Sequence, residues 1–181
     1  MIVVVNRHWR QLGVDGRNRA AYKPIHQIEN RNMLSQRAKY ALKALCQLAR
    51  HPEGQLMLVS EIAEREQAPR KFLELILLDL KRHGLVFSQR GKNGGYALAK
   101  SPAAITVGEV IRILDGPLAP LPCASLTGYR RCADCDEEAT CPVRLVMRQV
   151  RDAMAAIVDN TSIADAARSA YGEEAAALFA D

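Results

Sequence analysis

The apolar positions between residues 59 and 84 predict two helices joined by a turn. Ser60 suits the N-cap of the first helix, because its hydroxyl can accept a hydrogen bond from a free backbone N–H group. Pro69 suits the first turn of the second helix, and Gly84 is expected to end that helix. Apolar residues of the second helix recur at steps of three and four, so they form one buried stripe. The stripe consists of Phe72, Leu73, Ile76, Leu77 and Leu80.

Two short segments with strand character follow, at residues 85–89 and 96–99. The loop between them reads Arg90-Gly91-Lys92-Asn93-Gly94-Gly95, and its glycines and asparagine permit the positive φ angles that a tight hairpin needs. Two helices followed by such a hairpin predict a mainly α fold, a winged helix-turn-helix domain with a small β-hairpin wing. We place this domain at residues 33–116.

Capping signals mark two further helices of the domain. Ser35 is expected to cap a helix that runs to about Arg50. Thr106 and Glu109 form a T-x-x-E capping box for another helix, which we expect to end at Gly116. Residues 117–141 show little periodicity, so we predict a loop there.

Residues 142–158 return to a strong helical pattern with one apolar stripe. Its members are Val143, Val146, Met147, Val150, Ala153, Met154, Ile157 and Val158. Such a stripe must be buried against the domain's own core or against a second copy of the chain. Because two-fold DNA sites need two-fold proteins, we predict a long C-terminal dimerisation helix with its following turn at 142–165. No function is assigned to the tail at 166–181.

Charge is unevenly distributed over the chain, whose net charge is +5. Residues 33–100 hold 12 Lys and Arg against 6 Asp and Glu, whereas residues 101–181 hold 7 against 12. Residues 33–100 are therefore the part of the chain suited to bind a polyanion. An exposed basic hairpin can also be a solvated turn, and winged helices also bind proteins. The combined features favour DNA.

Individual side chains in this basic half are placed for different DNA contacts. Arg70 and Lys71 lie at the positive end of a predicted helix, where they can meet phosphate. Arg90 and Lys92 lie in the hairpin, from which an arginine can enter a narrow minor groove. Glu74 can accept a hydrogen bond from a cytosine amino group.

Composition and the first residues indicate a soluble protein. With 49% apolar and 25% charged residues, the chain can form one core and a dimer surface. The apolar run at residues 1–5 is too short for a signal peptide or a membrane span, so we expect a cytoplasmic protein without a membrane partner. Residues 1–32 form a basic extension, either an arm that adds DNA contacts or a disordered segment from an upstream start codon.

Four segments, LSQRAKYALKAL, PRKFLELILLDLKRHGLV, RGKNGGYALA and ITVGEVIRILDG, occur in that order. They resemble the Rrf-two family of bacterial winged helix-turn-helix transcription regulators, whose members include IscR-like and NsrR-like sensors. The resemblance covers residues 33–165, and the RGxxGGY wing is its most specific element. It implies a homodimer on a partly palindromic, double-stranded operator. We count Asn93, Gly94 and Tyr96 of the wing among the candidate DNA contacts.

Four of the five cysteines lie in the predicted loop, with the spacing C-x8-C-x2-C-x5-C. They are Cys123, Cys132, Cys135 and Cys141. Clustered thiols in a chain without export features point to metal or redox chemistry rather than to structural disulfides. The remaining cysteine, Cys46, is interpreted as a small buried hydrophobe.

The residues alone leave three chemistries open for this loop. Soft thiolates select zinc or iron–sulfur clusters, and four cysteines would satisfy tetrahedral zinc. Metal-free thiols can instead sense oxidants, with Cys132 and Cys135 the nearest pair in sequence. The family resemblance implies a 2Fe-2S or 4Fe-4S cluster on three cysteines, the last two separated by five residues, as Cys135 and Cys141 are. The first ligand is then Cys132 or Cys123, and a carboxylate of the acidic run at 134–138 can also serve.

These patterns and the family resemblance together predict a DNA-binding transcriptional regulator, a repressor that senses redox, iron or nitrosative state through an iron–sulfur cluster in the cysteine loop. The alternatives are a zinc-stabilised winged-helix adaptor that binds protein and a thiol-redox regulator without metal. No enzyme is expected, because no nucleophile–base set or phosphate-binding loop stands out.

Overall fold

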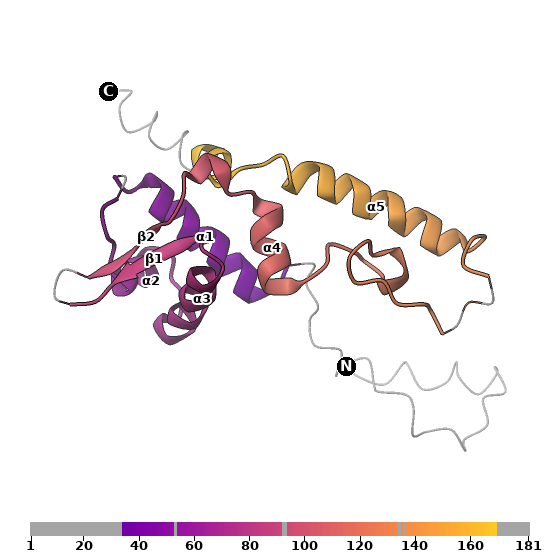
Figure 1. Cartoon of the computed structure of the whole chain (residues 1–181), viewed down its shortest axis with the longest axis horizontal. Helices are drawn as coiled ribbons and strands as arrows, with labels where there is room; N and C mark the ends of the chain where they lie inside the picture. Colours follow the sequence, from indigo (N-terminus) through magenta and orange to yellow (C-terminus); the bar gives the residue numbers. More distant parts are fainter. Residues whose placement is uncertain (1–33, 53, 92–93, 134, 136, 170–181) are drawn as a thin grey trace, which may run out of the picture. The chain divides into compact units, whose positions relative to one another are not determined.

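The computed structural model describes residues 34–169 except 53, 92–93, 134 and 136 (Figure 1). The element order is α1 (Gln36–Arg50), α2 (Val59–Arg65), α3 (Arg70–Arg82), β1 (Val86–Gln89), β2 (Gly95–Leu98), η3 (Pro102–Ala104), α4 (Val107–Asp115), η4 (Pro122–Ala124) and α5 (Pro142–Val158). Residues 163–169 are helical as well. This mainly helical order with one antiparallel hairpin confirms the predicted fold class. The predicted extension at 1–32 and most of the tail lie outside the described residues.

The core is formed chiefly by the inner faces of α1 and α3. The Ser35 hydroxyl accepts a hydrogen bond from the Ala38 N–H group at 3.0 Å, which confirms it as the N-cap of α1. The α3 stripe is confirmed too, because Leu73, Ile76, Leu77 and Leu80 are buried. Phe72 packs at the edge of the core, where its ring meets that of Tyr40 edge to face at a centroid distance of 6.1 Å.

The prediction of Ser60 as the N-cap of α2 is wrong. The helix begins at Val59, its N-cap is Leu58, and the Ile62 N–H group already donates to the Leu58 carbonyl at 3.1 Å. The reason lies in the preceding residue, since Met57 pairs with Tyr96 of β2 through two backbone hydrogen bonds of 2.9 Å. The chain therefore turns into the helix directly after this bridge. In the same way, Pro69 is the N-cap of α3 and does not lie within its first turn.

The wing is a tight antiparallel hairpin in which Val86 pairs with Leu98 and Gln89 with Gly95. The first strand begins one residue later than the predicted Leu85, and the second runs from Gly95 to Leu98, one residue earlier than predicted at both ends. Glycine is required at Gly95, because a Cβ atom there would lie 2.5 Å from the Met57 carbonyl oxygen. The wing is thus fastened to the segment before α2 as well as to itself.

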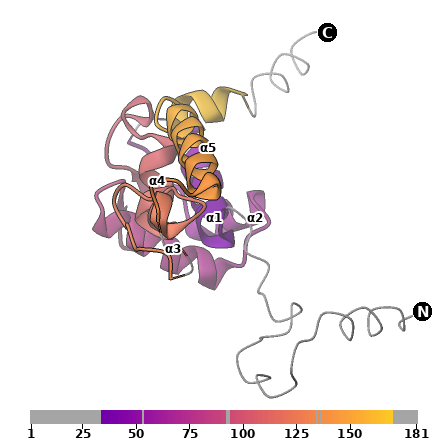
Figure 2. The ribbon, with the colours of Figure 1, turned by 90° about the vertical axis from the view of Figure 1, so that its right-hand side faces the viewer.

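Helix α4 contacts α1 and also α5 (Figures 1 and 2). The Thr106 hydroxyl caps α4 by accepting from the Glu109 N–H group at 3.0 Å. The Glu109 carboxylate does not complete the predicted capping box but accepts from Lys100 Nζ at 2.9 Å. At the other end, Gly116 adopts a φ of 86° and ends the helix as expected.

Helix α5 has the predicted bounds, Pro142 to Val158. The residue after it, Asp159, forms a two-pronged ion pair with Arg112 of α4, with an Nη2–Oδ2 distance of 2.9 Å. This ion pair and the contact of η4 with α5 position the helix on the rest of the described chain. None of the helices in the described ranges combines the length and the apolar character that crossing a membrane requires.

Candidate nucleic-acid interface and cysteine loop

The outer face of α3 carries four cations whose surroundings differ. Arg70 pairs with Glu74 through an Nε–Oε1 contact of 3.0 Å, and both side chains are exposed. Arg82 pairs with Asp79 at 2.9 Å. Lys81 Nζ donates to the Ser88 hydroxyl of β1 at 2.8 Å, which connects α3 to the wing.

Lys71 is exposed and makes no hydrogen bond or ion pair with the residues that the structure describes. It lies in the first turn of α3, where the helix dipole also favours an anion. Glu74 is less available than the sequence implied, because Arg70 already occupies one of its carboxylate oxygens. Contact of Arg70, Lys71 and Glu74 with DNA stays a prediction.

The candidate residues of the wing fall into three groups. Arg90 is exposed at the start of the hairpin loop, next to Gly91 with its φ of 112°. Lys92 and Asn93 lie outside the described residues. Gly94 is buried and its N–H group donates to the Gly91 carbonyl at 3.0 Å, while Tyr96 packs half-buried against the core. Gly94 and Tyr96 thus hold the wing's shape, and their contact with DNA stays a prediction.

Three of the four loop cysteines lie together. The Cys135 thiol donates a hydrogen bond to the Cys141 sulfur at an Sγ–Sγ distance of 3.7 Å, and all three of Cys132, Cys135 and Cys141 are partly exposed. Hydrogen bonding with Cys141, and then with Cys132, raises the pKa of Cys135 to about 12. The structure therefore places Cys132 beside the pair that has the five-residue gap.

Cys141 is the N-cap residue of α5, and this position governs its acidity. The backbone N–H group of Arg144 is the main cause that lowers the pKa of Cys141, followed by the hydrogen bond from Cys135. A helix N-terminus stabilises a thiolate in this way. Within the pair, Cys141 is thus the acceptor and Cys135 keeps its proton.

Cys123 has different surroundings from the other three. It is buried in η4, and no contact among the described residues joins its thiol to theirs. Its backbone carbonyl accepts a hydrogen bond from Arg144 Nε at 2.9 Å. Among the described residues, no group of three or more His, Cys, Asp or Glu side chains is arranged to hold a metal ion.

Two arginines of α5 hold the loop through contacts that the sequence did not predict. Arg144 donates to the carbonyls of Cys123 and Glu138, and the buried Arg151 donates to the carbonyl of Ala124. Their spacing of seven residues places them on one helix face, and that periodicity was the only available signal. Without knowledge of the loop's path, both look like solvated surface charges.

Glu138 holds the loop from within. Its carboxylate accepts from the Tyr129 hydroxyl at 2.6 Å and from the Cys132 N–H group at 3.2 Å. The hydrogen bond from Tyr129 is the main cause that lowers the pKa of Glu138, and it raises the pKa of Tyr129. The acidic run therefore includes one carboxylate with a structural task. Asp134 and Asp136 lie outside the described residues.

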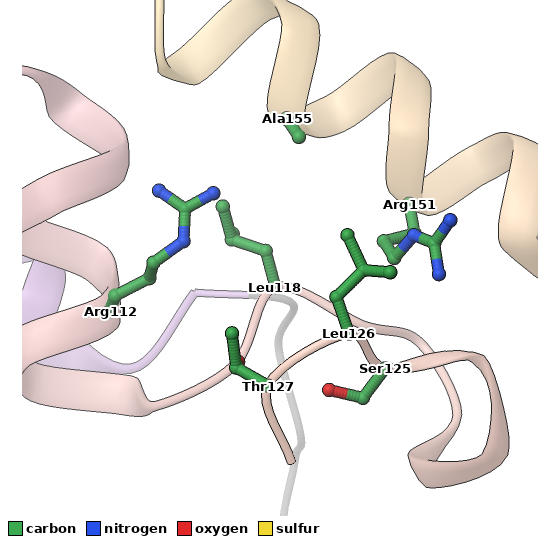
Figure 3. A pocket seen from close by; sticks show the side chains of 7 residues that line it. All are labelled: Arg112, Leu118, Ser125, Leu126, Thr127, Arg151 and Ala155. Atoms are coloured by element: carbon green, nitrogen blue, oxygen red, sulfur yellow. The ribbon is translucent and has the colours of Figure 1, made fainter. Parts of the chain in front are cut away.

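A small cavity lies between α4, the loop and α5, with the Arg112 and Arg151 side chains on opposite sides of it (Figure 3). Its volume is about 70 Å³ and Leu118, Leu126 and Ala155 contribute apolar walls. Both arginines are already paired, with Asp159 and Asp152 respectively. The cavity is therefore a packing gap under α5, and the two arginines that line it are already bound to carboxylates.

The apolar stripe of α5 is largely exposed. The exposed fractions are 57% for Val143, 52% for Val146, 37% for Val150 and 67% for Ile157. Arg151 is the buried residue of this helix. The alternative that the stripe belongs to the domain's own core is therefore wrong.

Comparisons with known proteins agree with this architecture. Residues 34–169 match the family model Rrf2, described as "Iron-dependent Transcriptional regulator". The chain is 43% identical over 152 residues to an rrf2-like HTH-type transcriptional regulator of Rhodobacter capsulatus, covering 82% of this chain and 100% of that protein. It is 35% identical over 147 residues to the HTH-type transcriptional regulator CymR of Bacillus subtilis, covering 81% and 97% of the two chains.

Solved structures give the same result. The structure of CymR (YrzC), the global cysteine regulator of B. subtilis, matches with a TM-score of 0.62 at 31% identity, over 75% of this chain and 96% of that one. IscR of T. potens matches with a TM-score of 0.59 at 28% identity, over 76% and 87%. These relatives are transcriptional regulators and not enzymes. The chain belongs to the Rrf2 family, the Rrf-two family of winged helix-turn-helix transcriptional regulators.

Proposed function

We propose that the chain is a cytoplasmic, homodimeric transcriptional repressor that binds a two-fold DNA operator. In this proposal an iron–sulfur cluster in the cysteine loop makes DNA binding depend on redox, iron or nitrosative state. The observation that carries the proposal is the position of the cysteines at the N-terminus of α5, the helix that exposes a long apolar stripe. One element thus connects a thiol site with a surface suited to a second copy.

The DNA side of the proposal rests on α3 and the wing. Lys71 and Arg70 at the start of α3 are assigned to phosphate, and Arg90 to the minor groove beside the wing. Lys92 and Asn93 belong to the same hairpin. The hydrogen bond from Lys81 to Ser88 connects α3 with the wing, and the proposed contact with DNA uses both elements.

Thiol side chains are the ligand type that an iron–sulfur cluster requires, and three of them lie close together in the loop. Cys135 and Cys141 are the preferred ligands, and Cys132 is preferred over Cys123 as the third because it lies beside Cys135 whereas Cys123 is buried apart. An iron–sulfur cluster, when bound, supplies a centre whose presence depends on iron and oxidants. Arg144 holds both ends of the loop, at Cys123 and Glu138, against α5. Disorder of the loop would therefore be transmitted to the start of the dimer helix.

The experiment is anaerobic purification of the full chain, followed by visible absorption, metal analysis and operator titration. Cys135→Ala and Cys141→Ala should each abolish the visible absorption and change operator affinity, and Cys132→Ala should do the same. Cys123→Ala should retain the colour. Cys46→Ala is the matched control, because Cys46 is a buried cysteine of α1 outside the loop. Colourless wild-type protein under anaerobic conditions would contradict the cluster.

The distance between the sulfur atoms of Cys135 and Cys141 also supports two alternatives, a zinc site and a disulfide. Their separation of 3.7 Å is close to the ~3.8 Å between two sulfur ligands of a tetrahedral metal with bonds of ~2.3 Å, as a single Zn²⁺ would need. The same closeness suits a reversible Cys135–Cys141 disulfide formed by peroxide. Stoichiometric zinc without colour supports the former, and metal-free protein whose DNA affinity changes with peroxide supports the latter. A protein-binding adaptor is less supported, since the relatives are transcriptional regulators.

A further inference from the structure

Two leucines of α3 lie on its exposed side. Leu75 is 62% exposed and Leu78 is 41% exposed. By contrast, Leu73, Ile76, Leu77 and Leu80 of the same helix are at most 1% exposed. Successive helical residues lie about 100° apart, so Leu75 and Leu78 are on the side opposite the buried stripe, together with Lys71 and Arg82.

Cations surround these leucines along the helix. Lys71 lies one turn before Leu75, and Lys81 and Arg82 lie in the last turn, beyond Leu78. An apolar surface between cations is complementary to a partner with anionic rims and an apolar floor. The major groove of DNA offers both features where thymines occur, since phosphates line its edges and the C5-methyl group of each thymine projects from otherwise polar base edges.

Glu74 is another side chain of α3 that can reach a base edge, but its carboxylate is engaged by Arg70 at 3.0 Å. A leucine side chain has no polar group to pair, so it can contact a base without first breaking another interaction. The charged residues thus suit phosphate contacts, while the leucines suit base discrimination.

We propose that Leu75, with Leu78 beside it, reads thymine C5-methyl groups in the major groove, so that A·T base pairs lie beneath the middle of α3 in the operator. The inference rests on the proposed DNA-binding function and names the bases that this face selects.

The test begins with selection of preferred duplexes from a random pool by the full-length wild-type protein. Each thymine of the selected site is then replaced by deoxyuridine, which removes only the methyl group and keeps the base pairing. Wild-type affinity should fall about fourfold at one or two positions, the amount expected for one buried methyl group. Leu75→Ala should bind the original site about tenfold more weakly and should show no further loss with deoxyuridine at those positions.

Two more variants complete the design. Leu75→Gln keeps a good helix former at an exposed site and should also lose the deoxyuridine sensitivity, which guards against a folding defect of the alanine variant. Leu145→Ala is the matched control, because Leu145 is 45% exposed but lies on α5, away from α3 and outside the apolar stripe. It should keep both the affinity and the sensitivity of the wild type.

The outcomes separate this inference from the proposed function. Methyl sensitivity that persists in Leu75→Ala, or that is absent in the wild type, overturns the inference while DNA binding stands. A wild-type protein that enriches no sequence and binds DNA without salt dependence overturns the DNA-binding function itself.

Discussion

Cys46 shows how one buried residue responds to its neighbours. Burial is the main cause that raises the pKa of its thiol to about 11, and the negative charge of Glu66 is the second. Glu66 is itself buried and is bound by Lys43 at 2.9 Å. The Cys46 thiol therefore stays neutral in the folded protein at pH values where an exposed thiol ionises, which agrees with its interpretation as a small hydrophobe.

This shift predicts a loss of stability in alkaline solution. The unfolded thiol ionises near its ordinary pKa of 9.0 and the folded one near 11, so the folded state binds the proton more strongly between these values. The contribution of Cys46 is complete below pH 9 and is lost as the pH rises through 11, by about 3 kcal/mol in total. Urea unfolding from pH 8 to 11 should show a steeper decline for the wild type than for Cys46→Ala. Parallel declines would contradict the assignment.

At the scale of elements, α3 and the wing are the two parts to which we assign DNA contacts, with a different task for each. The Lys81–Ser88 hydrogen bond joins them, and the Met57–Tyr96 pairing fixes the wing to the segment before α2. The start of α3 is assigned to phosphate, so its contacts should raise affinity for every DNA sequence. The wing is assigned to the minor groove, so its contacts should raise affinity mainly for preferred sequences.

Lys71 and Arg90 test this division. Lys71→Ala should weaken binding to all sequences and lower the slope of log K against log salt by about one unit. Arg90→Ala should reduce affinity for the preferred site more than for random DNA, because a minor-groove arginine senses groove shape. Gel-shift or anisotropy titrations over a range of salt concentrations measure both. Arg148→Ala removes the same charge from α5 and should leave the salt slope unchanged; a change as large as that of Lys71 would point to a general charge effect.

At the scale of the whole molecule, the exposed stripe of α5 supports the proposed homodimer. Val143, Val146 and Ile157 are each more than half exposed, whereas the arginine-bearing face of the helix is occupied by the loop. A dimer through this stripe would place two α3 helices on one DNA duplex, as two-fold operators require.

Val150→Glu should convert the protein to monomers and lower its affinity for a palindromic site together with dimerisation. Two like charges would otherwise be buried near each other across the axis. Leu145→Glu is the matched control, since Leu145 is 45% exposed on the same helix but lies outside the stripe. Light scattering measures the mass of both variants. A dimeric Val150→Glu protein would show that the stripe is not the interface.

The fold was predictable where a pattern is local and strong, and not where distant segments decide. The bounds of α5 follow from its apolar period and from Pro142 at its start. The start of α2 could not be predicted from Ser60 as an N-cap, because the backbone bridge between Met57 and Tyr96 fixes the chain just before the helix. For the cysteines, spacing alone cannot rank Cys123 against Cys132.

The contacts of Arg144 and Arg151 were unpredictable for a related reason. Each guanidinium binds backbone carbonyls of an irregular loop, and the path of such a loop leaves no periodic trace in the sequence. Two arginines on a polar helix face are then indistinguishable from solvated charges until the loop's path is known.

These arginine contacts also separate the loop's anchorage from its chemistry. Every residue type supplies a main-chain carbonyl, so the acceptors at positions 123, 124 and 138 persist whichever side chains stand there. In the proposed function, exchange of the cysteines would alter or abolish what the loop binds while the loop stays attached to α5. A lineage of such proteins is thus free to change its signal by substitution within the loop and to inherit the mechanical linkage to the helix unchanged.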